Sequence, residues 1–256
     1  LAFKLRYVDG VRSPPSKSMF VGKIVHSGLE CFYRHKQVGV TLPAADIIQR
    51  MDACWEPLAA DDGLELKDSA EEAKLRSQSA SLVAAYLTQL SDDEPAPTTV
   101  ETRLEAPLVD PFNGEDLGIP LLGVVDLVVD SDDGPLVCDF KTSARSGSPV
   151  EIMHEVQLTA YAYLFRQLSG KKEAGLEIRS LIKTKKPQLR VHRYDRRSDQ
   201  HFQRLFAAIR AYLADLRSQE FIFRPGFACS WCDFRETHCQ QWAGTSVPVE
   251  GKEASA

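Results

Sequence analysis

The chain has 256 residues, of which 43% are hydrophobic and 26% are charged, and its formal net charge is −5. This composition is typical of a globular domain, and without an apolar run of about 18 residues it excludes a membrane-spanning protein. The negative net charge argues against indiscriminate nucleic-acid binding. No signal peptide is visible, so we expect a cytoplasmic, intracellular protein.

The N-terminal part of the sequence predicts helices. A helix over residues 18–36 is expected to begin at the cap Ser18, and its core face is the apolar stripe of Val21, Val25, Leu29 and Phe32. Two more helices are predicted over 44–58 and 68–90, joined by the acidic loop 60–63. The Pro- and Thr-rich residues 95–99 form a connector to the next part of the chain.

Strands and helices are mixed in the second half. Strands are predicted over 100–108, 120–130, 135–142, 176–184 and 189–194. A helix is expected over 149–168, with a capping box at 148–151 and Gly170 after its end, and another over 199–219. The last ordered unit is 221–242. This order of elements predicts a mixed α/β domain around one sheet.

A β-hairpin is predicted at the centre of the sequence. Two runs of apolar, β-branched residues flank a turn that ends in Asp-Gly, which is a strong hairpin signal. With residues 131–134 as the loop, Asp130 pairs with Pro135. The same register places Asp126 directly opposite Asp139 on the neighbouring strand.

Two carboxylates in these positions would destabilise a sheet, and burying them among apolar residues costs further free energy. A divalent cation between Asp126 and Asp139 would remove both penalties, and oxygen ligands suit Mg²⁺ or Mn²⁺. Lys141 follows Asp139 by two residues and so points to the same face, where a lysine can orient an attacking water. The alternative is an ordinary hairpin whose aspartates face solvent.

Two further polar sets come after the hairpin. Gln157 and Tyr161 are spaced i, i+4 on a predicted helix and therefore share one face. Residues 171–197 carry ten Lys or Arg against three acids, a local balance of +7 that suits contact with a phosphate backbone. On charge alone, a solvated surface sheet is the better explanation of this basic stretch.

Three cysteines, Cys229, Cys232 and Cys239, lie within eleven residues near the C-terminus. In an intracellular protein this clustering predicts a metal centre rather than disulfides. Zinc would need a fourth ligand, for which His238 is poorly placed beside Cys239, and an iron–sulfur cluster would need a fourth thiolate. The remaining cysteines are expected to be buried thiols, namely Cys31, Cys54 and Cys138.

Together these motifs resemble the RecB-like branch of the PD-(D/E)xK nucleases. The matching segments are Gly123-x-x-Asp126, Asp139-x-Lys141-Thr142 and Gln157-x-x-x-Tyr161, preceded by the helix around Gly22 to His26 and followed by Lys183 to Pro187. They occur in the order of that branch over roughly residues 1–242. Val125 stands where the superfamily's name implies proline.

The resemblance implies an α/β fold with a restriction-endonuclease-like core, in which helices flank a mixed central sheet and an N-terminal helical insertion is present. It implies one nuclease domain over 1–242, made of a helical part (18–90), a catalytic core (100–220) and a cysteine clip (221–242). The Gly-, Ser- and Ala-rich residues 243–256 are expected to form a disordered tail.

The resemblance also implies residue roles. His26, Asp126, Asp139 and the backbone carbonyl of Phe140 would bind one or two Mg²⁺ or Mn²⁺ ions, and Lys141 would position the attacking water. Gln157 and Tyr161 would steady Lys141 or the DNA backbone. We further expect four basic residues to contact DNA phosphates without reading bases, namely Lys183, Lys185, Arg190 and Arg193.

Many nucleases of this type close their structure with a [4Fe–4S] cluster. One of its cysteines precedes the His-containing helix, and three form a C-terminal group like Cys229, Cys232 and Cys239. The opening residues of this chain resemble the segment that lies directly after that first cysteine in the family. We therefore expect the fourth ligand upstream of Leu1, and the cluster in a longer parent protein.

The sequence thus predicts a metal-dependent DNA exonuclease or nuclease that acts on single strands or DNA ends, in repair, recombination, or phage- or CRISPR-related processing. A Walker lysine motif is absent, so a helicase motor would belong to a partner subunit or another part of the protein. One alternative is a non-catalytic DNA-end-binding subunit with a structural iron–sulfur or zinc clip. Another is a redox or zinc protein centred on its cysteines.

Overall fold

A computed structural model describes residues 1–144, 151–219, 221, 223–226, 229–230 and 232–240. The chain divides into two compact units, of which the larger is Pro14–Arg210 and the smaller combines Leu1–Ser13 with Ala211–Ala256. The larger unit contains the central sheet, and the smaller unit contains the three C-terminal cysteines. The predicted tail over 243–256 lies outside the described residues.

Three helices precede the sheet, as predicted: α1 (Lys17–Gln37), α2 (Ala44–Asp62) and α3 (Ser69–Gln89). The cap of α1 is Ser16 rather than Ser18, because the extended backbone of Ser16 lets its hydroxyl accept the Met19 amide at 3.3 Å. Residues 60–62 belong to α2 and not to a loop. The helix continues to Gly63, which ends it in the left-handed conformation at a φ of 63°.

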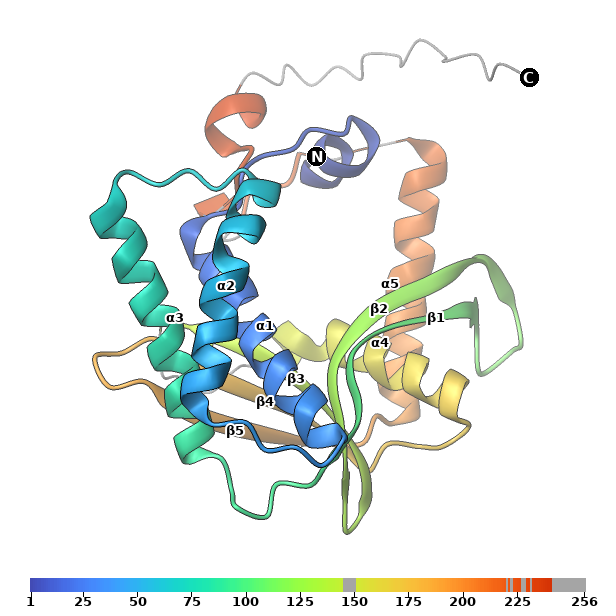
Figure 1. Cartoon of the computed structure of the whole chain (residues 1–256). Helices are drawn as coiled ribbons and strands as arrows, with labels where there is room; N and C mark the ends of the chain where they lie inside the picture. The colour runs from blue at the N-terminus through green and yellow to red at the C-terminus, as the bar shows by residue number, and fades with distance from the viewer. Residues whose placement is uncertain (145–150, 220, 222, 227–228, 231, 241–256) are drawn as a thin grey trace, which may run out of the picture. The chain divides into compact units, whose positions relative to one another are not determined.

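The sheet has five strands in the order β1-β2-β3-β4-β5. Only β3 and β4 run parallel among these neighbours, so the sheet is mixed, as the sequence predicts (Figure 1). Because β1 begins at Pro97, part of the connector predicted over 95–99 is strand. The strands are β1 (Pro97–Val109), β2 (Asp116–Ser131), β3 (Gly134–Ser143), β4 (Gly175–Ile182) and β5 (Gln188–Asp195).

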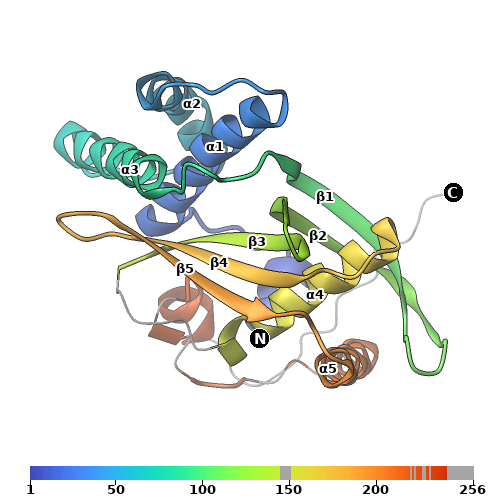
Figure 2. The same cartoon turned by 90° about the horizontal axis from the view of Figure 1, so that it is seen from below.

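Helices cover both faces of the sheet. Helix α4 (Glu151–Ser169) connects β3 to β4, and α5 (Asp199–Ser218) follows β5. Figure 2 shows α1, α2 and α3 on one face and α4 on the other. Alternate residues of β2 feed the two resulting cores: Val129 packs with the α1–α3 side and Val128 with the α4 side.

The central hairpin has the predicted register. Asp130 pairs with Pro135, and the ladder continues to Leu127 and Cys138. Ser131 also pairs with Gly134, so the loop is shorter than the predicted 131–134. Asp126 and Asp139 are the next residues beyond the last ladder pair, so the ladder ends where the candidate site begins.

Two other local predictions have mixed outcomes. Gly170 ends α4 at a φ of 67°, as predicted, whereas residues 148–150 of the predicted capping box lie outside the described residues. Cys138 is buried, but Cys54 is exposed and Cys31 is half-buried. The prediction of three buried thiols is therefore wrong for Cys54 and Cys31. Cys54 is exposed because the buried face of α2 is formed by Ile47, Met51 and Trp55.

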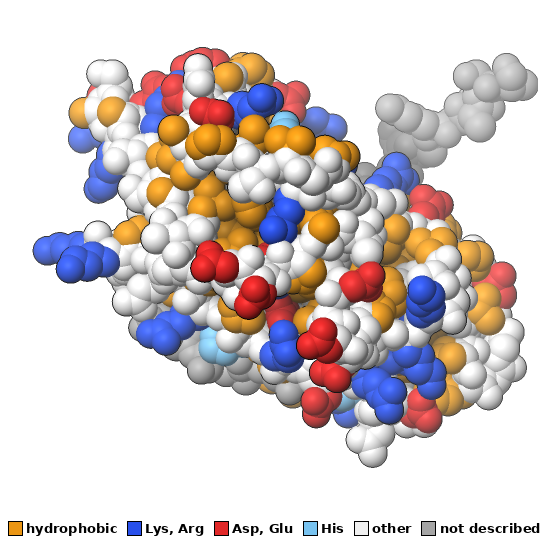
Figure 3. All heavy atoms as spheres, turned by 60° about the horizontal axis from the view of Figure 1, so that its bottom comes forward, with side chains coloured by type: hydrophobic (Ala, Val, Ile, Leu, Met, Phe, Trp, Pro, Cys, Tyr) orange, Lys and Arg blue, Asp and Glu red, His pale blue; other side chains and the backbone are white. Residues whose placement is uncertain are grey.

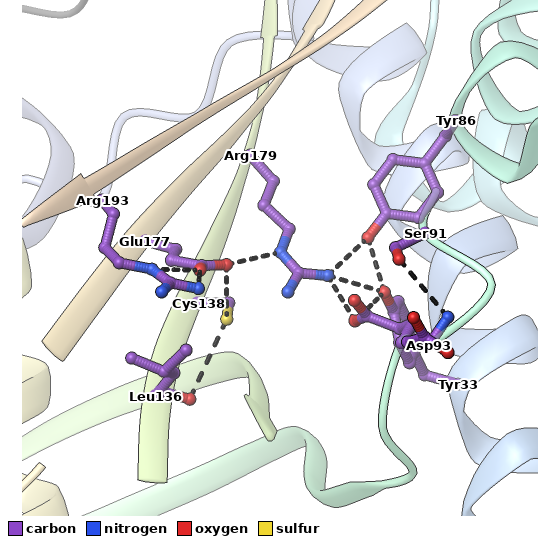
Figure 4. Close-up of polar contacts among 10 residues, drawn as sticks. Tyr33, Tyr86, Ser91, Asp93, Leu136, Cys138, Glu177, Arg179 and Arg193 are labelled. Carbon is purple, nitrogen blue, oxygen red and sulfur yellow. Dashed lines mark hydrogen bonds and ion pairs between the residues drawn. The ribbon is translucent and has the colours of Figure 1, made fainter. Parts of the chain in front are cut away.

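A buried ionic network ties helices α1 and α3 to β4 (Figure 4). The guanidinium of Arg179 donates to Glu177 at 2.9 Å, to Glu94 at 2.6 Å, and to the phenol oxygens of Tyr33 and Tyr86 at 2.8 and 3.0 Å. Arg179 is only 4% exposed. The network therefore satisfies a charge that would otherwise be costly to bury.

In the part of the chain that the structure describes, none of the helices combines the length and the apolar composition that a membrane span requires.

Candidate active site

Asp126 lies where the β2–β3 ladder stops, and the main chain fixes its carboxylate. Its Oδ2 accepts a hydrogen bond of 2.7 Å from the backbone amide of Phe140. Asp126 is only 6% exposed, so this carboxylate has little access to water. The backbone of β3 thus holds one of the predicted metal ligands.

Helix α1 brings His26 to the same place. Nε2 of His26 lies 3.1 Å from the carbonyl oxygen of Phe140, and Nδ1 lies 3.8 Å from Oδ2 of Asp126. The imidazole also packs edge-on against the ring of Phe140, with 5.8 Å between ring centroids. Three groups that the family resemblance names as metal ligands therefore converge: His26, Asp126 and the Phe140 carbonyl.

Glu101 of β1 joins this group, although it belongs to none of the motifs in the sequence. Its Oε1 lies 3.4 Å from Nδ1 of His26. The ligand atoms of His26, Glu101 and Asp126 all lie within 4.8 Å of one another. The sequence shows Glu101 only as an acid within a β-branched run. Its place beside Asp126 depends on the register between β1 and β2, which the sequence does not reveal.

The backbone of Glu101 is unusual. Its φ of 39° is in the left-handed region, which non-glycine residues rarely adopt. Its neighbours Val100 and Thr102 pair with Leu127 and Val125, so Glu101 lies across from Asp126. A strained conformation of this kind persists only where surrounding contacts enforce it, and such residues often cluster at functional sites.

Asp139 has a different set of partners. Its Oδ2 forms an ion pair of 2.6 Å with Nζ of Lys141, which confirms that the two side chains share a face. Its Oδ1 accepts a hydrogen bond of 2.9 Å from Nε2 of Gln157 on α4. The same Gln157 nitrogen lies 2.9 Å from the phenol oxygen of Tyr161. The structure therefore joins the predicted lysine, aspartate, glutamine and tyrosine in one chain of contacts.

Close packing of α4 against β2 keeps Gln157 and Tyr161 in place. A Cβ atom at Gly123 would lie 2.9 Å from Leu164 and 3.3 Å from the ring of Tyr161. Any larger residue at Gly123 would have to displace the side chains of Leu164 and Tyr161. Gly123, which belongs to the first motif of the resemblance, thus has a packing reason to be glycine.

Burial and mutual repulsion shift the protonation of the candidate ligands. Burial raises the pKa of Asp126 to about 7, and the carboxylate of Asp139 adds to the rise although His26 opposes it. Burial favours the neutral ring of His26, but its hydrogen bond to Glu101 and the charge of Asp126 outweigh burial and raise its pKa. The site thus holds negative charges that the folded chain alone does not fully compensate.

The donor set fits a hard divalent cation. Carboxylate and carbonyl oxygens are the ligands that Mg²⁺ and Mn²⁺ prefer, and imidazole suits transition metals. Neighbouring ligands of an octahedral ion with bonds of about 2.1 Å lie about 3 Å apart. The 3.4 Å between His26 Nδ1 and Glu101 Oε1 is close to this spacing.

A cleft of about 730 Å³ opens beside these residues. It is lined by α1, α2, β1 and β3, and its walls include His26, Glu101 and Lys141. His26, Glu101 and Lys141 therefore face one common space, and the buried Asp126 and Asp139 lie behind this wall. This is the arrangement expected of an active site.

The sequence of the chain assigns it to a known family. Residues 1–240 match the model of the PD-(D/E)XK nuclease superfamily. The chain belongs to this superfamily. The match covers the helices, the sheet and the cysteine segment, so it includes every residue of the site described above.

One solved structure shows the same fold as this nuclease. A protein described as "Putative exonuclease" from Eubacterium rectale has a TM-score of 0.58 at 13% sequence identity, covering 96% of this chain and 82% of that chain. At this identity the similarity shows the fold alone. The structure of SSO0001 has a TM-score of 0.40 at 15% identity, covering 90% of this chain and 89% of that one. No curated protein sequence matches the chain.

The four predicted DNA-contacting residues of this nuclease lie in different surroundings. Lys185 is exposed, and Arg190 donates to Gln188 at 3.2 Å. Lys183 donates to the hydroxyl of Ser18 at 2.8 Å, and burial lowers its pKa. Arg193 is paired with Glu177 at 2.7 Å. Figure 3 shows a face on which acidic and basic side chains are interspersed.

The cysteine segment of the nuclease lies in the smaller unit, together with the N-terminal residues. There Arg6 forms an ion pair of 3.1 Å with Asp233, and its guanidinium lies over the ring of Phe234 at 5.5 Å. Among the described residues, Cys229, Cys232 and Cys239 do not form a group of ligand atoms close enough to hold a metal as they stand. The donor set as placed therefore does not fit a preformed cluster site.

Proposed function

We propose that this chain is a metal-dependent DNA nuclease that hydrolyses phosphodiester bonds, and specifically an exonuclease. The observation that supports the proposal most strongly is the convergence of His26, Glu101 and Asp126 beside the ion pair of Asp139 and Lys141. A purely structural hairpin would have no need for a second buried acid beside Asp139.

His26, Asp126, Asp139 and the carbonyl of Phe140 are the proposed ligands of Mg²⁺ or Mn²⁺, and Glu101 is added to them on the geometry. A bound divalent cation would lower the pKa of a water and neutralise charge on phosphate oxygens. The residues of the chain supply the geometry. Helix α1 and strand β3 orient the donors before substrate arrives, which limits the reorganisation needed in the reaction.

Lys141 positions the attacking water in this proposal. Its ammonium is held 2.6 Å from Asp139, and it lines the cleft that a phosphate would enter. Gln157 holds the other oxygen of Asp139 and so keeps that carboxylate from rotating. Tyr161 in turn accepts a hydrogen bond from Gln157, so it acts on the site through Gln157.

DNA is the proposed substrate, either single-stranded or at its ends. Lys183, Lys185, Arg190 and Arg193 are proposed to contact phosphates. Neutralising any one should weaken binding equally across sequences and lower the salt dependence by about one counterion. An unchanged salt dependence for all four variants would instead make these strands an ordinary solvated surface.

The RecB-like resemblance supports a wider proposal, namely a role in DNA repair or recombination beside a helicase subunit. It also supports a metal centre at Cys229, Cys232 and Cys239. This centre would require the cysteine segment to rearrange, with a fourth ligand joining it. Anaerobic purification followed by iron, sulfide and zinc analysis tests this: stoichiometric iron and sulfide would support the cluster, and stoichiometric zinc alone would replace it.

The nuclease proposal is tested with end-labelled linear single-stranded and double-stranded DNA, and with internally labelled circular DNA, in Mg²⁺, Mn²⁺ or EDTA. We expect cleavage of linear substrates in either metal, none in EDTA, and none by the Asp126→Asn variant. Resistance of circular DNA would identify an exonuclease. Tight DNA binding without cleavage in either metal would contradict the proposal and favour a non-catalytic end-binding subunit.

A further inference from the structure

One face of α1 borders the active-site cleft, and it carries opposite charges on the two sides of His26. Lys23 lies one turn toward the N-terminus of the helix, and Glu30 lies one turn toward its C-terminus. Both line the cleft. The α1 residues on this wall recur at helical spacing: Met19, Gly22, Lys23, His26, Ser27 and Glu30.

Other charges continue this asymmetry. On the side of Lys23, Nζ of Lys183 donates to the hydroxyl of Ser18 in the first turn of α1. That end of the helix also carries the positive end of the dipole of a 21-residue helix. On the other side, Glu30 pairs with Arg34 at 2.7 Å, but Arg34 does not line the cleft. Among the described residues of α1 that line the cleft, the charge on the N-terminal side of His26 is therefore the cation Lys23, and the charge on the C-terminal side is the acid Glu30.

Lys23 is placed to reach a neighbouring phosphate. It is three residues from His26, a rise of about 4.5 Å along the helix axis, and its side chain extends further. In the structure its ammonium pairs with Asp62, the last residue of α2, at 2.7 Å. The side chain of Lys23 is 41% exposed, so exchanging this partner for a phosphate would cost little.

We propose that Lys23 is a positioning residue that binds the phosphate next to the scissile one. The DNA strand then runs from His26 along α1 toward the N-terminus of that helix. Asp62 forms the ion pair with Lys23 when DNA is absent. This inference rests on the proposed nuclease function, because it assigns the direction of the substrate in the same cleft.

A structural role for the same ion pair makes a different prediction. If Lys23 and Asp62 only fasten α1 to α2, removing either partner should have the same effect on the protein. If Lys23 binds phosphate, removing Asp62 frees the lysine. Removing Lys23 should then lower DNA affinity, whereas removing Asp62 should raise it or leave it unchanged.

The first experiment measures binding of a fluorescent single-stranded oligonucleotide to the full chain in Ca²⁺, over a range of salt concentrations. We expect Lys23→Ala to bind about threefold to tenfold more weakly and to lose about one counterion from the salt dependence. Lys23→Arg should keep both the affinity and the salt dependence of wild type. Asp62→Ala should bind at least as tightly as wild type, and Lys74→Ala, which changes an exposed lysine on α3, should be unchanged.

The second experiment measures cleavage of oligonucleotides that carry one neutral methylphosphonate linkage, placed on either side of the cleaved bond. We expect wild type to be slowed by the neutral linkage on one side only, and Lys23→Ala to lose that difference. Equal sensitivity of wild type on both sides would overturn the assignment. So would equal weakening of binding by Lys23→Ala and Asp62→Ala.

These results also separate the inference from the function on which it rests. Wild-type cleavage of unmodified DNA with unchanged binding by Lys23→Ala would remove only the role of Lys23. Failure of wild type to cleave any unmodified DNA in Mg²⁺ or Mn²⁺ would count against the nuclease proposal itself, and the role of Lys23 would fall with it.

Discussion

The backbone amide of Phe140 donates a hydrogen bond of 2.7 Å to Asp126, so a main-chain group positions this carboxylate. The carbonyl of the same residue lies 3.1 Å from the ring of His26. One residue of β3 therefore sets the positions of two candidate ligands from different elements. Both contacts use main-chain atoms of Phe140, so displacing β3 would disturb both.

The buried carboxylate of Asp126 predicts how stability depends on pH when metal is absent. Its folded-state pKa of about 7 is above the ordinary value for an aspartate, so folding favours its protonated form. In EDTA, this contribution is fully present below about pH 4 and is lost as the pH rises to about 7. Melting curves of wild type between pH 5 and pH 8 should therefore show Tm falling as pH rises.

The control is Asp126→Asn, whose side chain has nearly the same shape but does not ionise. We expect its Tm to change less with pH, and to exceed that of wild type near pH 8 in EDTA. His26, whose pKa is also raised, leaves some dependence of the same sign. Identical pH profiles for the two proteins would show that Asp126 is not the titrating group.

Lys141 is predicted to act on turnover rather than on DNA affinity. Its ammonium is held against Asp139, so its loss removes a charge from the reaction site. We expect Lys141→Ala to lower kcat by about a hundredfold or more, the scale of one lost acid–base or electrostatic group. DNA binding in Ca²⁺ should change little, and Lys185→Ala should show the reverse pattern. A parallel fall of affinity and turnover in Lys141→Ala would make it a phosphate anchor.

Glu101 allows backbone strain and metal binding to be separated. Glycine adopts a φ of 39° without steric strain whereas alanine is strained there, so Glu101→Gly should be more stable than Glu101→Ala by about 1 kcal/mol. Both variants should bind Mn²⁺ more weakly than wild type, by a similar factor, because both lose the carboxylate. Urea unfolding and Mn²⁺ titration measure the two effects. Wild-type Mn²⁺ affinity in both variants would remove Glu101 from the ligand set.

The local part of the site could be predicted from the sequence. The turn composition fixed the register that places Asp126 and Asp139 beside each other, and helical spacing placed Gln157 and Tyr161 on one face. In both cases the residues in contact are close in sequence. Helix caps were predicted less well, because Ser16 and Ser18 are both plausible from composition, and only the backbone decides between them.

Long-range contacts could not be predicted in this way. Glu101 meets His26 across 75 residues, and Arg179 meets Tyr33 across 146 residues. No periodicity or turn signal relates such positions, since they depend on how helices pack on the sheet. The placement of His26 came from a family resemblance, and the residues alone would have left it an ordinary surface histidine. A buried arginine network has no sequence signature of this kind.

That network gives the last prediction. Glu177 is 1% exposed and accepts hydrogen bonds from both Arg179 and Arg193. Burial alone would raise the pKa of Glu177, but the two guanidinium groups outweigh burial and lower it. Its contribution to stability is therefore present above the ordinary glutamate pKa, and it is lost as the pH falls through the lowered value.

We expect Glu177→Gln to lower the free energy of unfolding by about 3–5 kcal/mol at pH 7, because it leaves the buried guanidinium of Arg179 with one fewer negative partner. The difference from wild type should shrink as the pH falls below about 4.5. Arg193→Gln is the matched control: the Arg193 side chain is 62% exposed, so its loss should cost about 1 kcal/mol or less. Urea unfolding at pH 7, 5 and 4 measures all three proteins. Two results would contradict this prediction: a loss of unfolding free energy in Glu177→Gln that stays constant over this pH range, or an equal loss in Arg193→Gln. Either would mean that packing rather than the buried charge pair stabilises this part of the fold.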